Sequence, residues 1–120
     1  MFKRLRHHHI SFTNAVNGIL WAFTTQPNFL IHFSLSAIAL WAGIYLQISR
    51  LEMIVIVFTV ILGLTAEMIN TSIEAMTDLI TRQYHQDAKI AKDVSAGMML
   101  ITAIGSVIVA AYIFIPQLTG

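Results

Sequence analysis

Long apolar runs separated by short polar segments make up most of this chain. In the run 29–48, His32 is the only residue that titrates near neutral pH, and the run 94–115 carries no charged residue. A helix that crosses a bilayer needs about 20 apolar residues, because the hydrocarbon core is about 30 Å thick. The two runs therefore predict two membrane-spanning helices, over about 29–48 and 94–115.

A further span is predicted between them, over about 51–82, although acids interrupt its second half. No charged residue occurs from Met53 to Ala66. The segment then continues into four polar residues: Glu67, Asn70, Glu74 and Asp78. At 100° per residue in a helix, their side chains fall in one stripe about 80° wide. The spacing therefore predicts one helix whose acids and amide share a face, directed at the interior of the bundle.

The depth of Glu67 makes it a candidate for chemistry. It lies about 15 residues from the outer end of its span, or about 22 Å at 1.5 Å per residue, which places it inside the hydrocarbon core. An ionisable side chain in the membrane costs roughly 2.5–3.5 kcal/mol on insertion scales and is a functional candidate by default. Glu74 then comes near the inner interface, and Asp78 lies beyond it.

A shorter amphipathic helix is predicted ahead of the first span, over about 11–25. Its apolar side chains recur at steps of four, three and four residues: Phe12, Val16, Ile19 and Phe23. Asn14 falls elsewhere on the helix, so the apolar face can lie on a membrane surface. Gln26 and Pro27 end this helix, because proline disfavours helical backbone in the residue before it. A membrane anchor without chemistry is the simpler reading of this segment.

The composition agrees with a membrane protein of one domain, 1–120. Of the residues, 57% are hydrophobic and 11% are charged, and the mean hydropathy is +0.74. Soluble domains carry about 25% charged residues. The chain has no cysteine, which excludes disulfides. With a net charge of only +1, we expect membrane lipids as partners and no nucleic acid.

The distribution of the basic residues predicts the orientation in the membrane. Six of the seven Lys and Arg residues lie in the N-terminal tail or in the long polar loop predicted at 82–92. Three spans put these two segments on one side, which the positive-inside rule makes cytoplasmic. We therefore expect a multi-pass protein of the bacterial inner membrane, with its N-terminus and its site cytoplasmic and a tight outer turn at 49–52. The basic tail lacks the apolar segment of a secretory signal and fits a position near anionic headgroups.

Polar groups from all three predicted spans meet at the level of the acids. His32 lies just inside the first span, and Lys92 and Asp93 lie where the third begins. Simpler explanations exist for three of these groups. Asp93 fits a helix N-cap, Lys92 fits a lysine that snorkels to the interface, and Asp78 fits a solvated charge.

Three spans are too few to surround a site, so an oligomer is expected. Small residues that let helices approach closely support this expectation: Gly43, Ser95, Ala96, Gly97, Ser106 and Ala110.

The residue types in the polar group fit phosphoryl transfer. Carboxylates with an amide can hold Mg²⁺, which prefers oxygen ligands and shares them with phosphates. A lysine at a helix start can neutralise phosphate oxygens, and a deep carboxylate such as Glu67 can take a proton from an alcohol. These are the parts of a phosphoryl-transfer site. The sequence has neither a P-loop nor the glycine-rich loop of protein kinases.

Two motifs carry a resemblance to a known family. The first reads E-x-x-N-T-x-I-E-x-x-x-D from Glu67 to Asp78, and the second reads A-K-x-A-K-D-x-x-A-G from Ala88 to Gly97. The upstream patterns that match are S-F-x-x-A-x-x-G from Ser11 and N-F-x-I-H from Asn28. Over about residues 10–115, the chain resembles the prokaryotic diacylglycerol kinase/undecaprenol kinase family.

The resemblance implies a homotrimeric integral-membrane lipid kinase, with three transmembrane helices and a surface helix in each subunit. Such an enzyme transfers the γ-phosphate of ATP to a lipid alcohol at the cytoplasmic interface, with Mg²⁺ as cofactor. Glu67 would be the catalytic base. The implied nucleotide-binding residues are Asn14, Gln26, Glu74, Asp78, His85, Lys92 and Asp93. The implied metal ligands are Glu74, Gln26 and Asn70, and the implied lipid-binding residues are Asn70, Glu67 and Met98.

Two positions depart from the family pattern. A glutamate usually stands where this chain has Gln26, and an arginine commonly stands where it has Leu30. In the resembled family that glutamate helps to bind metal with the nucleotide. Because a glutamine cannot supply the charge, we expect metal dependence to be weakened or altered.

The acceptor is predicted from the loop that follows the acids. Its form, A-K-I-A-K-D-V-x-A-G, looks more like the undecaprenol kinase branch, so undecaprenol is the expected acceptor. A diacylglycerol kinase that makes phosphatidic acid is the alternative. Two alternatives belong to other functional classes: a small proton-coupled transporter and a non-catalytic membrane scaffold. A transporter would place its acid near the midplane and would need a fourth span.

Overall fold

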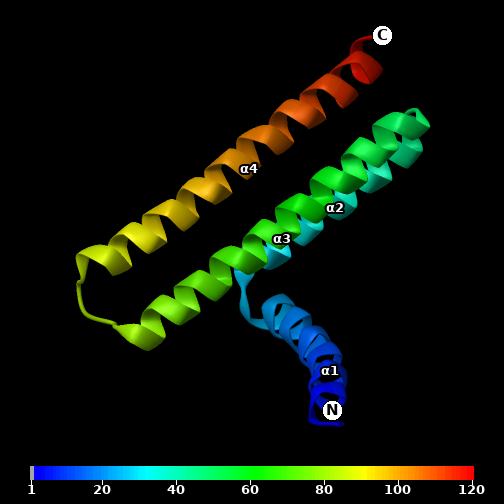
Figure 1. Ribbon diagram of the computed structural model, residues 1–120. Helices are drawn as coiled ribbons and strands as arrows, with labels where there is room; N and C mark the ends of the chain where they lie inside the picture. The colour runs from blue at the N-terminus through cyan, green and yellow to red at the C-terminus, as the bar shows by residue number, and fades with distance from the viewer. Residues whose placement is uncertain (1) are drawn as a thin grey trace.

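The described part of the chain forms four helices, and three of them run side by side. The computed structural model describes the backbone of residues 2–120 and the side chains of residues 11–120. The helices are α1 (Phe2–Thr25), α2 (Pro27–Tyr45), α3 (Arg50–Ile80) and α4 (Gln86–Thr119) (Figure 1). In length and composition, α2, α3 and α4 are each able to cross a membrane. The prediction of an all-α membrane protein with three spans is confirmed.

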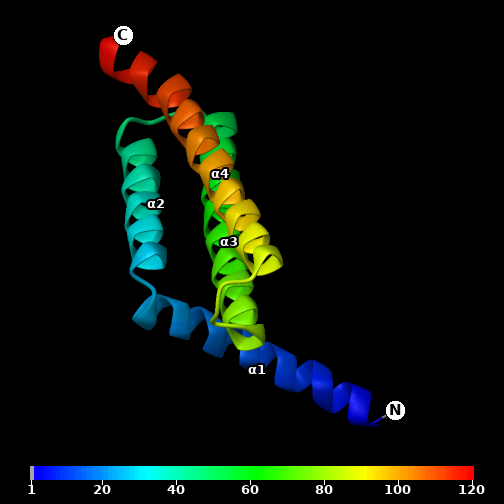
Figure 2. The same ribbon diagram turned by 90° about the vertical axis from the view of Figure 1, so that its left-hand side faces the viewer.

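Helix α3 is the centre of the arrangement. It packs against both α4 and α2, while α1 makes its main contacts with α2. Helix α1 runs across the direction of the other three (Figure 2). This direction agrees with the prediction of a surface helix ahead of the spans. The basic residues of the tail lie outside the part of the chain whose side chains are described.

The break between α1 and α2 falls where the sequence predicted it. Gln26 is the N-cap of α2 with extended backbone, and Pro27 occupies the first position of the helix, where its missing N–H costs nothing. Aromatic rings hold the corner, since the ring centroid of Phe23 lies 4.8 Å from that of Phe33 and 6.1 Å from that of Phe29. The corner therefore holds the end of α1 against the first turns of α2.

A tight turn connects α2 to α3 at the opposite end of the bundle. Ser49 caps α3: its hydroxyl accepts from the Glu52 N–H, and the Glu52 carboxylate accepts from the Ser49 N–H. This reciprocal pair is a capping box. Gly43 is buried beside the turn, and a Cβ there would lie 2.9 Å from side-chain carbons of Ile48 and Met53. The glycine therefore allows the close approach of the two helices that the sequence indicated.

The connection between α3 and α4 is shorter than the pattern predicted. Helix α4 begins at Gln86, so only residues 81–85 remain outside helix and the predicted polar loop at 82–92 is wrong. His85 caps the helix, because its Nδ1 accepts from the Asp87 N–H at 3.1 Å. Lys89 and Asp93 then pair one turn apart, which supports a helix at its exposed start. Asp93 lies inside α4 and is not its N-cap.

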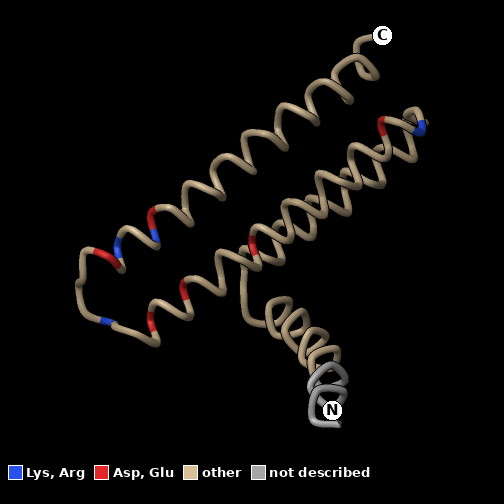
Figure 3. Tube along the Cα trace, in the orientation of Figure 1, with Lys and Arg blue, Asp and Glu red and all other residues tan. Residues whose placement is uncertain are grey.

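Helices α3 and α4 are longer than a bilayer requires. They have 31 and 34 residues, which is about 46 and 51 Å at 1.5 Å per residue, against a core of about 30 Å. Their surplus length lies at the end joined by residues 81–85, where the charged residues gather (Figure 3). The polar ends of both helices therefore project beyond the hydrocarbon.

Candidate functional site

The deepest ionisable side chain in the described part of the chain is Glu67. It is only 4% exposed, and its Oε2 lies 3.6 Å from Nε2 of His32 on α2. That separation is longer than a hydrogen bond, so the contact is electrostatic. The sequence offers no base near Glu67, and the packing of α2 on α3 supplies one. The expected convergence of His32 with the acids is confirmed at this residue.

One turn along α3, Asn70 is held by the neighbouring helix. The hydroxyl of Ser95 on α4 donates to Oδ1 of Asn70 at 2.7 Å, and Ser95 is fully buried. The bond fixes the orientation of the Asn70 amide, whose NH₂ group can then donate to a ligand. Sequence reasoning treated Ser95 only as a small residue. Ser95 follows Lys92 by three positions, so the two residues share a face of the helix. This spacing could have indicated that Ser95 faces the polar stripe of α3.

A second pair of residues joins α3 to α4 closer to the chain connection. Nζ of Lys92 donates to Oδ1 of Asp78 at 2.8 Å, and both side chains are 45% exposed. Asp93, the other predicted residue of this segment, pairs with Lys89 on its own helix. Lys92 lies two turns inside α4 and not at its start, so it can offer a charge but does not share the helix N-terminus.

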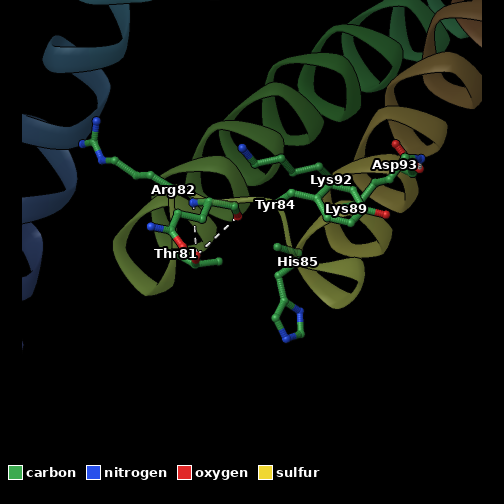
Figure 4. A pocket seen from close by; sticks show the side chains of 9 residues that line it. Thr81, Arg82, Tyr84, His85, Lys89, Lys92 and Asp93 are labelled. Atoms are coloured by element: carbon green, nitrogen blue, oxygen red, sulfur yellow. Dashed lines mark hydrogen bonds and ion pairs between the residues drawn. The ribbon is translucent and has the colours of Figure 1, made fainter.

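A cavity of about 270 Å³ opens beside this pair, where α3 gives way to α4. Its lining contains three basic side chains, those of Arg82, Lys89 and Lys92, against one acid, Asp93. Figure 4 shows these side chains around the connection, with the imidazole of His85 pointing away from Lys92. That direction agrees with its role as the cap of α4. Lys89 is paired with Asp93 and Lys92 with Asp78, and with Arg82 these basic side chains make the cavity a candidate for phosphate.

Glu74 is the member of the polar stripe that departs from expectation. It lies on the same side of α3 as its neighbours in the stripe, yet its side chain is exposed. Helix α2 begins five residues before His32, which is about 7.5 Å along its axis. Because His32 lies beside Glu67, the first residue of α2 is level with about residue 72 of α3. Helix α2 therefore does not cover α3 beyond residue 72. From there α4 continues beside α3 and α2 does not (Figure 1). Glu74 is therefore exposed, at a level along α3 between Glu67 and Asp78.

The remaining predicted residues are spread over other elements. Asn14 is exposed on α1, Gln26 caps α2, and Met98 is half-buried on α4. The Gln26 amide donates to the hydroxyl of Thr25 at 3.4 Å. Among the side chains of residues 11–120, no three of His, Asp or Glu converge as a metal site. The roles assigned to these three residues stay predictions.

A groove of about 370 Å³ leads away from His32 between α2, α3 and α4. Apolar carbon dominates its lining, which includes Leu35, Ile56, Val60 and Val107. Its hydroxyls are satisfied within their own helices, since Thr59 donates to the carbonyl of Val55 and Thr102 to that of Met98. The groove therefore offers an apolar path from the His32–Glu67 contact into the middle of the bundle.

Comparisons with known proteins agree on one family. Residues 13–114 match the family described as prokaryotic diacylglycerol kinase. A diacylglycerol kinase of Synechocystis sp. is 38% identical over 110 residues, which are 91% of this chain and 63% of the relative. An undecaprenol kinase of Bacillus subtilis is 38% identical over 109 residues, which are 90% of this chain and 88% of the relative. The chain thus spans less than two thirds of the first relative and most of the second.

Proposed function

Because this chain belongs to the prokaryotic diacylglycerol kinase family, we propose that it transfers the γ-phosphate of ATP to undecaprenol in the membrane. The observation that carries the proposal is the burial of the Glu67 carboxylate at the head of an apolar groove. A lipid alcohol can reach that position from the bilayer, whereas ATP can reach the exposed cavity at the other end of the same stripe.

Glu67 is the base in the proposed reaction. The oxygen of the lipid hydroxyl attacks the γ-phosphorus, a new O–P bond forms, and the bond from that phosphorus to the bridging oxygen of ADP breaks. The hydroxyl proton passes to the Glu67 carboxylate. Burial among helices excludes water from this carboxylate, which protects the transfer from hydrolysis.

The nucleotide phosphates are proposed to lie along the seam between α3 and α4. Glu67 and Asp78 are about 16 Å apart along α3 at 1.5 Å per residue, so the phosphates must extend between them. Lys92 and Lys89 at the cavity offer positive charge, and the amide of Asn70, fixed by Ser95, lies on the way. Preorganised charges and amides of this kind supply most of the catalysis in phosphoryl transfer.

The residues on the seam fit a magnesium ion shared with the nucleotide. Mg²⁺ usually takes one or two carboxylates together with substrate phosphates. Glu74, exposed and acidic, and Asn70 would hold it, and Gln26 would add a neutral amide oxygen. When bound, the ion would neutralise charge on the β- and γ-phosphates.

Restoring a carboxylate at position 26 tests the metal side of the proposal. We expect Gln26→Glu to lower the Mg²⁺ concentration that gives half-maximal activity by about three- to tenfold, because a charged ligand replaces a neutral one. Activity at fixed ATP is measured over a magnesium series. Gln47→Glu, in the turn at the other end of α2, is the matched control. An unchanged magnesium curve for Gln26→Glu would contradict a role for position 26 in metal binding.

The choice of undecaprenol is supported by the relatives. Both are 38% identical to the chain, but the chain covers 88% of the undecaprenol kinase and 63% of the diacylglycerol kinase. The acceptor is tested by offering undecaprenol and diacylglycerol together in mixed micelles with γ-labelled ATP. We expect most of the label in undecaprenyl phosphate. Preferential labelling of phosphatidic acid would replace undecaprenol by diacylglycerol and leave the lipid kinase activity standing.

The groove that begins at His32 is proposed to hold the tail of the acceptor. Gly63 lines it, and a Cβ added there meets no atom within 4 Å. The first carbon of a side chain at this position therefore meets no obstacle, and a leucine would extend into the groove. We expect Gly63→Leu to raise KM for the lipid by about tenfold, the scale of losing pocket contacts for one side chain, with KM for ATP unchanged.

Gly105 supplies the control for the groove variant. It is exposed on α4, outside the groove, and a Cβ there also meets no atom within 4 Å. Gly105→Leu adds the same side chain to a membrane helix and is expected to leave KM for the lipid unchanged. Equal lipid KM values for the wild type and Gly63→Leu would exclude the groove as the place of the tail.

The protein is proposed to act as a homotrimer in the bacterial inner membrane, with the site on the cytoplasmic side. The family resemblance supports the trimer. The charge distribution supports the orientation: Arg82, Lys89 and Lys92 lie at the site end of α3 and α4, and Arg50 lies at the other end. An excess of Lys and Arg marks the cytoplasmic side of membrane proteins.

A further inference from the structure

Each turnover of the proposed reaction leaves one proton on the Glu67 carboxylate. Glu67 takes a proton from the lipid hydroxyl and must lose it before the next transfer. Its side chain is only 5% exposed, so water has little direct access to the carboxylate. A group between Glu67 and the surface is therefore needed to regenerate the base.

We propose that His32 receives this proton from Glu67 and passes it to water. Its Nε2 is 3.6 Å from Oε2 of Glu67, and its side chain is 33% exposed against 5% for the glutamate. The imidazole thus lies beside the buried acid with one nitrogen. His32 is five residues, or about 7.5 Å along the axis, from the start of α2, which places the ring near the polar end of the bundle. This inference rests on the proposed kinase activity and assigns a positioning residue to the same site.

The proton balance of the step is simple. The neutral acid of Glu67 gives its proton to Nε2 of His32, which yields a carboxylate and an imidazolium. The imidazolium then releases a proton to water from its exposed side, and both groups return to their starting states. Transfer requires the two atoms to approach from 3.6 Å to about 2.7–3.0 Å. Catalytic hydrogen bonds are often that much longer before the substrate binds.

The surroundings of His32 contain no other described group that would replace it. From α4, the groove presents Thr102, Ala103 and Ser106, which carry no charge. From α1, the described residues 11–25 include no Asp, Glu, Lys, Arg or His. From α3, Glu67 is the titratable residue that faces the ring, and Glu74 lies two turns further on. The proton therefore has one short route among these side chains.

Removing the imidazole tests the relay. We expect His32→Ala to lower kcat by about tenfold to a hundredfold, below the full effect of a general base, with KM for ATP and lipid within about twofold of wild type. Removal of the ring leaves a space beside Glu67 that added imidazole can fill. We therefore expect imidazole to restore part of kcat, and kcat of the variant to rise with buffer concentration at constant pH.

Several controls separate a relay from a merely structural role. His32→Asn, which keeps a polar side chain, must show the same buffer dependence, and detergent-solubilised variants are checked for helicity and size. Imidazole must not rescue Glu67→Gln, since the base itself is absent. Full activity of His32→Ala, or a loss of kcat that neither imidazole nor buffer changes, would overturn the relay. Absence of lipid phosphorylation by the wild type would overturn the kinase proposal, and the relay with it.

Discussion

Glu67→Gln is expected to abolish nearly all phosphate transfer while leaving the protein folded. The glutamine has the same shape and keeps its place beside His32, but it cannot accept the proton of the lipid hydroxyl. We expect kcat to fall by about a thousandfold or more, the upper range for loss of a positioned base. KM for ATP should stay within about threefold, because the cavity lined by Lys89 and Lys92 is remote from the change. Initial rates with labelled ATP in mixed micelles measure both constants.

The matched control is the same substitution at the opposite end of α3. Glu52 closes the capping box with Ser49, and glutamine is also accepted at that position of a capping box. Glu52→Gln is therefore expected to keep wild-type kcat. Equal activity of Glu67→Gln and wild type would remove Glu67 as the base without excluding a lipid kinase.

Lys92→Met is expected to weaken ATP binding more than any other single change at the cavity. Nζ of Lys92 is held at the seam by Asp78, and its other N–H groups can donate to phosphate oxygens. A hydrogen bond to a charged group is worth about 1.5–3 kcal/mol, so KM for ATP should rise by about ten- to hundredfold. KM for the lipid should not change, because the groove lies on the other side of Glu67.

The loss of the Asp78–Lys92 pair is not expected to unfold the protein. Both side chains are 45% exposed, and exposed pairs contribute about 0–1 kcal/mol to stability. Arg50→Met removes one positive charge at the far end of α3 and serves as the control. An unchanged KM for ATP in Lys92→Met would show that the phosphates bind elsewhere.

The helices and the polar stripe were predictable because they depend on periodicity and length. The apolar runs define three spans whatever they pack against, and a regular helix puts Glu67, Asn70 and Asp78 on one face. The deep position of Glu67 follows from its distance to the turn at Ser49. These features come from local sequence, and the structure confirms the three spans and the burial of Glu67.

The side-chain contacts between α3 and α4 could not be predicted from periodicity and length. Ser95 meets Asn70, and Lys92 meets Asp78, only because α4 folds back along α3 in one particular register. That register depends on where α4 begins. Hydropathy placed the start at the apolar run, whereas His85 and the Lys89–Asp93 pair extend the helix through polar residues. The exposure of Glu74 likewise depends on how far α2 reaches, which periodicity in α3 does not encode.

The family match and the geometry of α3 and α4 support different conclusions about the protein. The matches give the class of protein. Along the seam, Glu67 is buried and Lys92 is exposed, and on this difference we propose the lipid at the first and the nucleotide at the second. A proton-coupled transporter would also bury a carboxylate. It would not require a basic cavity at the exposed end of the same stripe, and this cavity favours a kinase.

The central claim is tested most directly by asking whether the wild-type protein phosphorylates a lipid alcohol at all. The purified chain is reconstituted in mixed micelles with undecaprenol or diacylglycerol, Mg²⁺ and γ-labelled ATP, and the extracted lipid is counted and identified. The account predicts a labelled lipid monophosphate that requires both the chain and ATP and is lost in Glu67→Gln. Label that stays entirely in ATP and inorganic phosphate with either alcohol would contradict it.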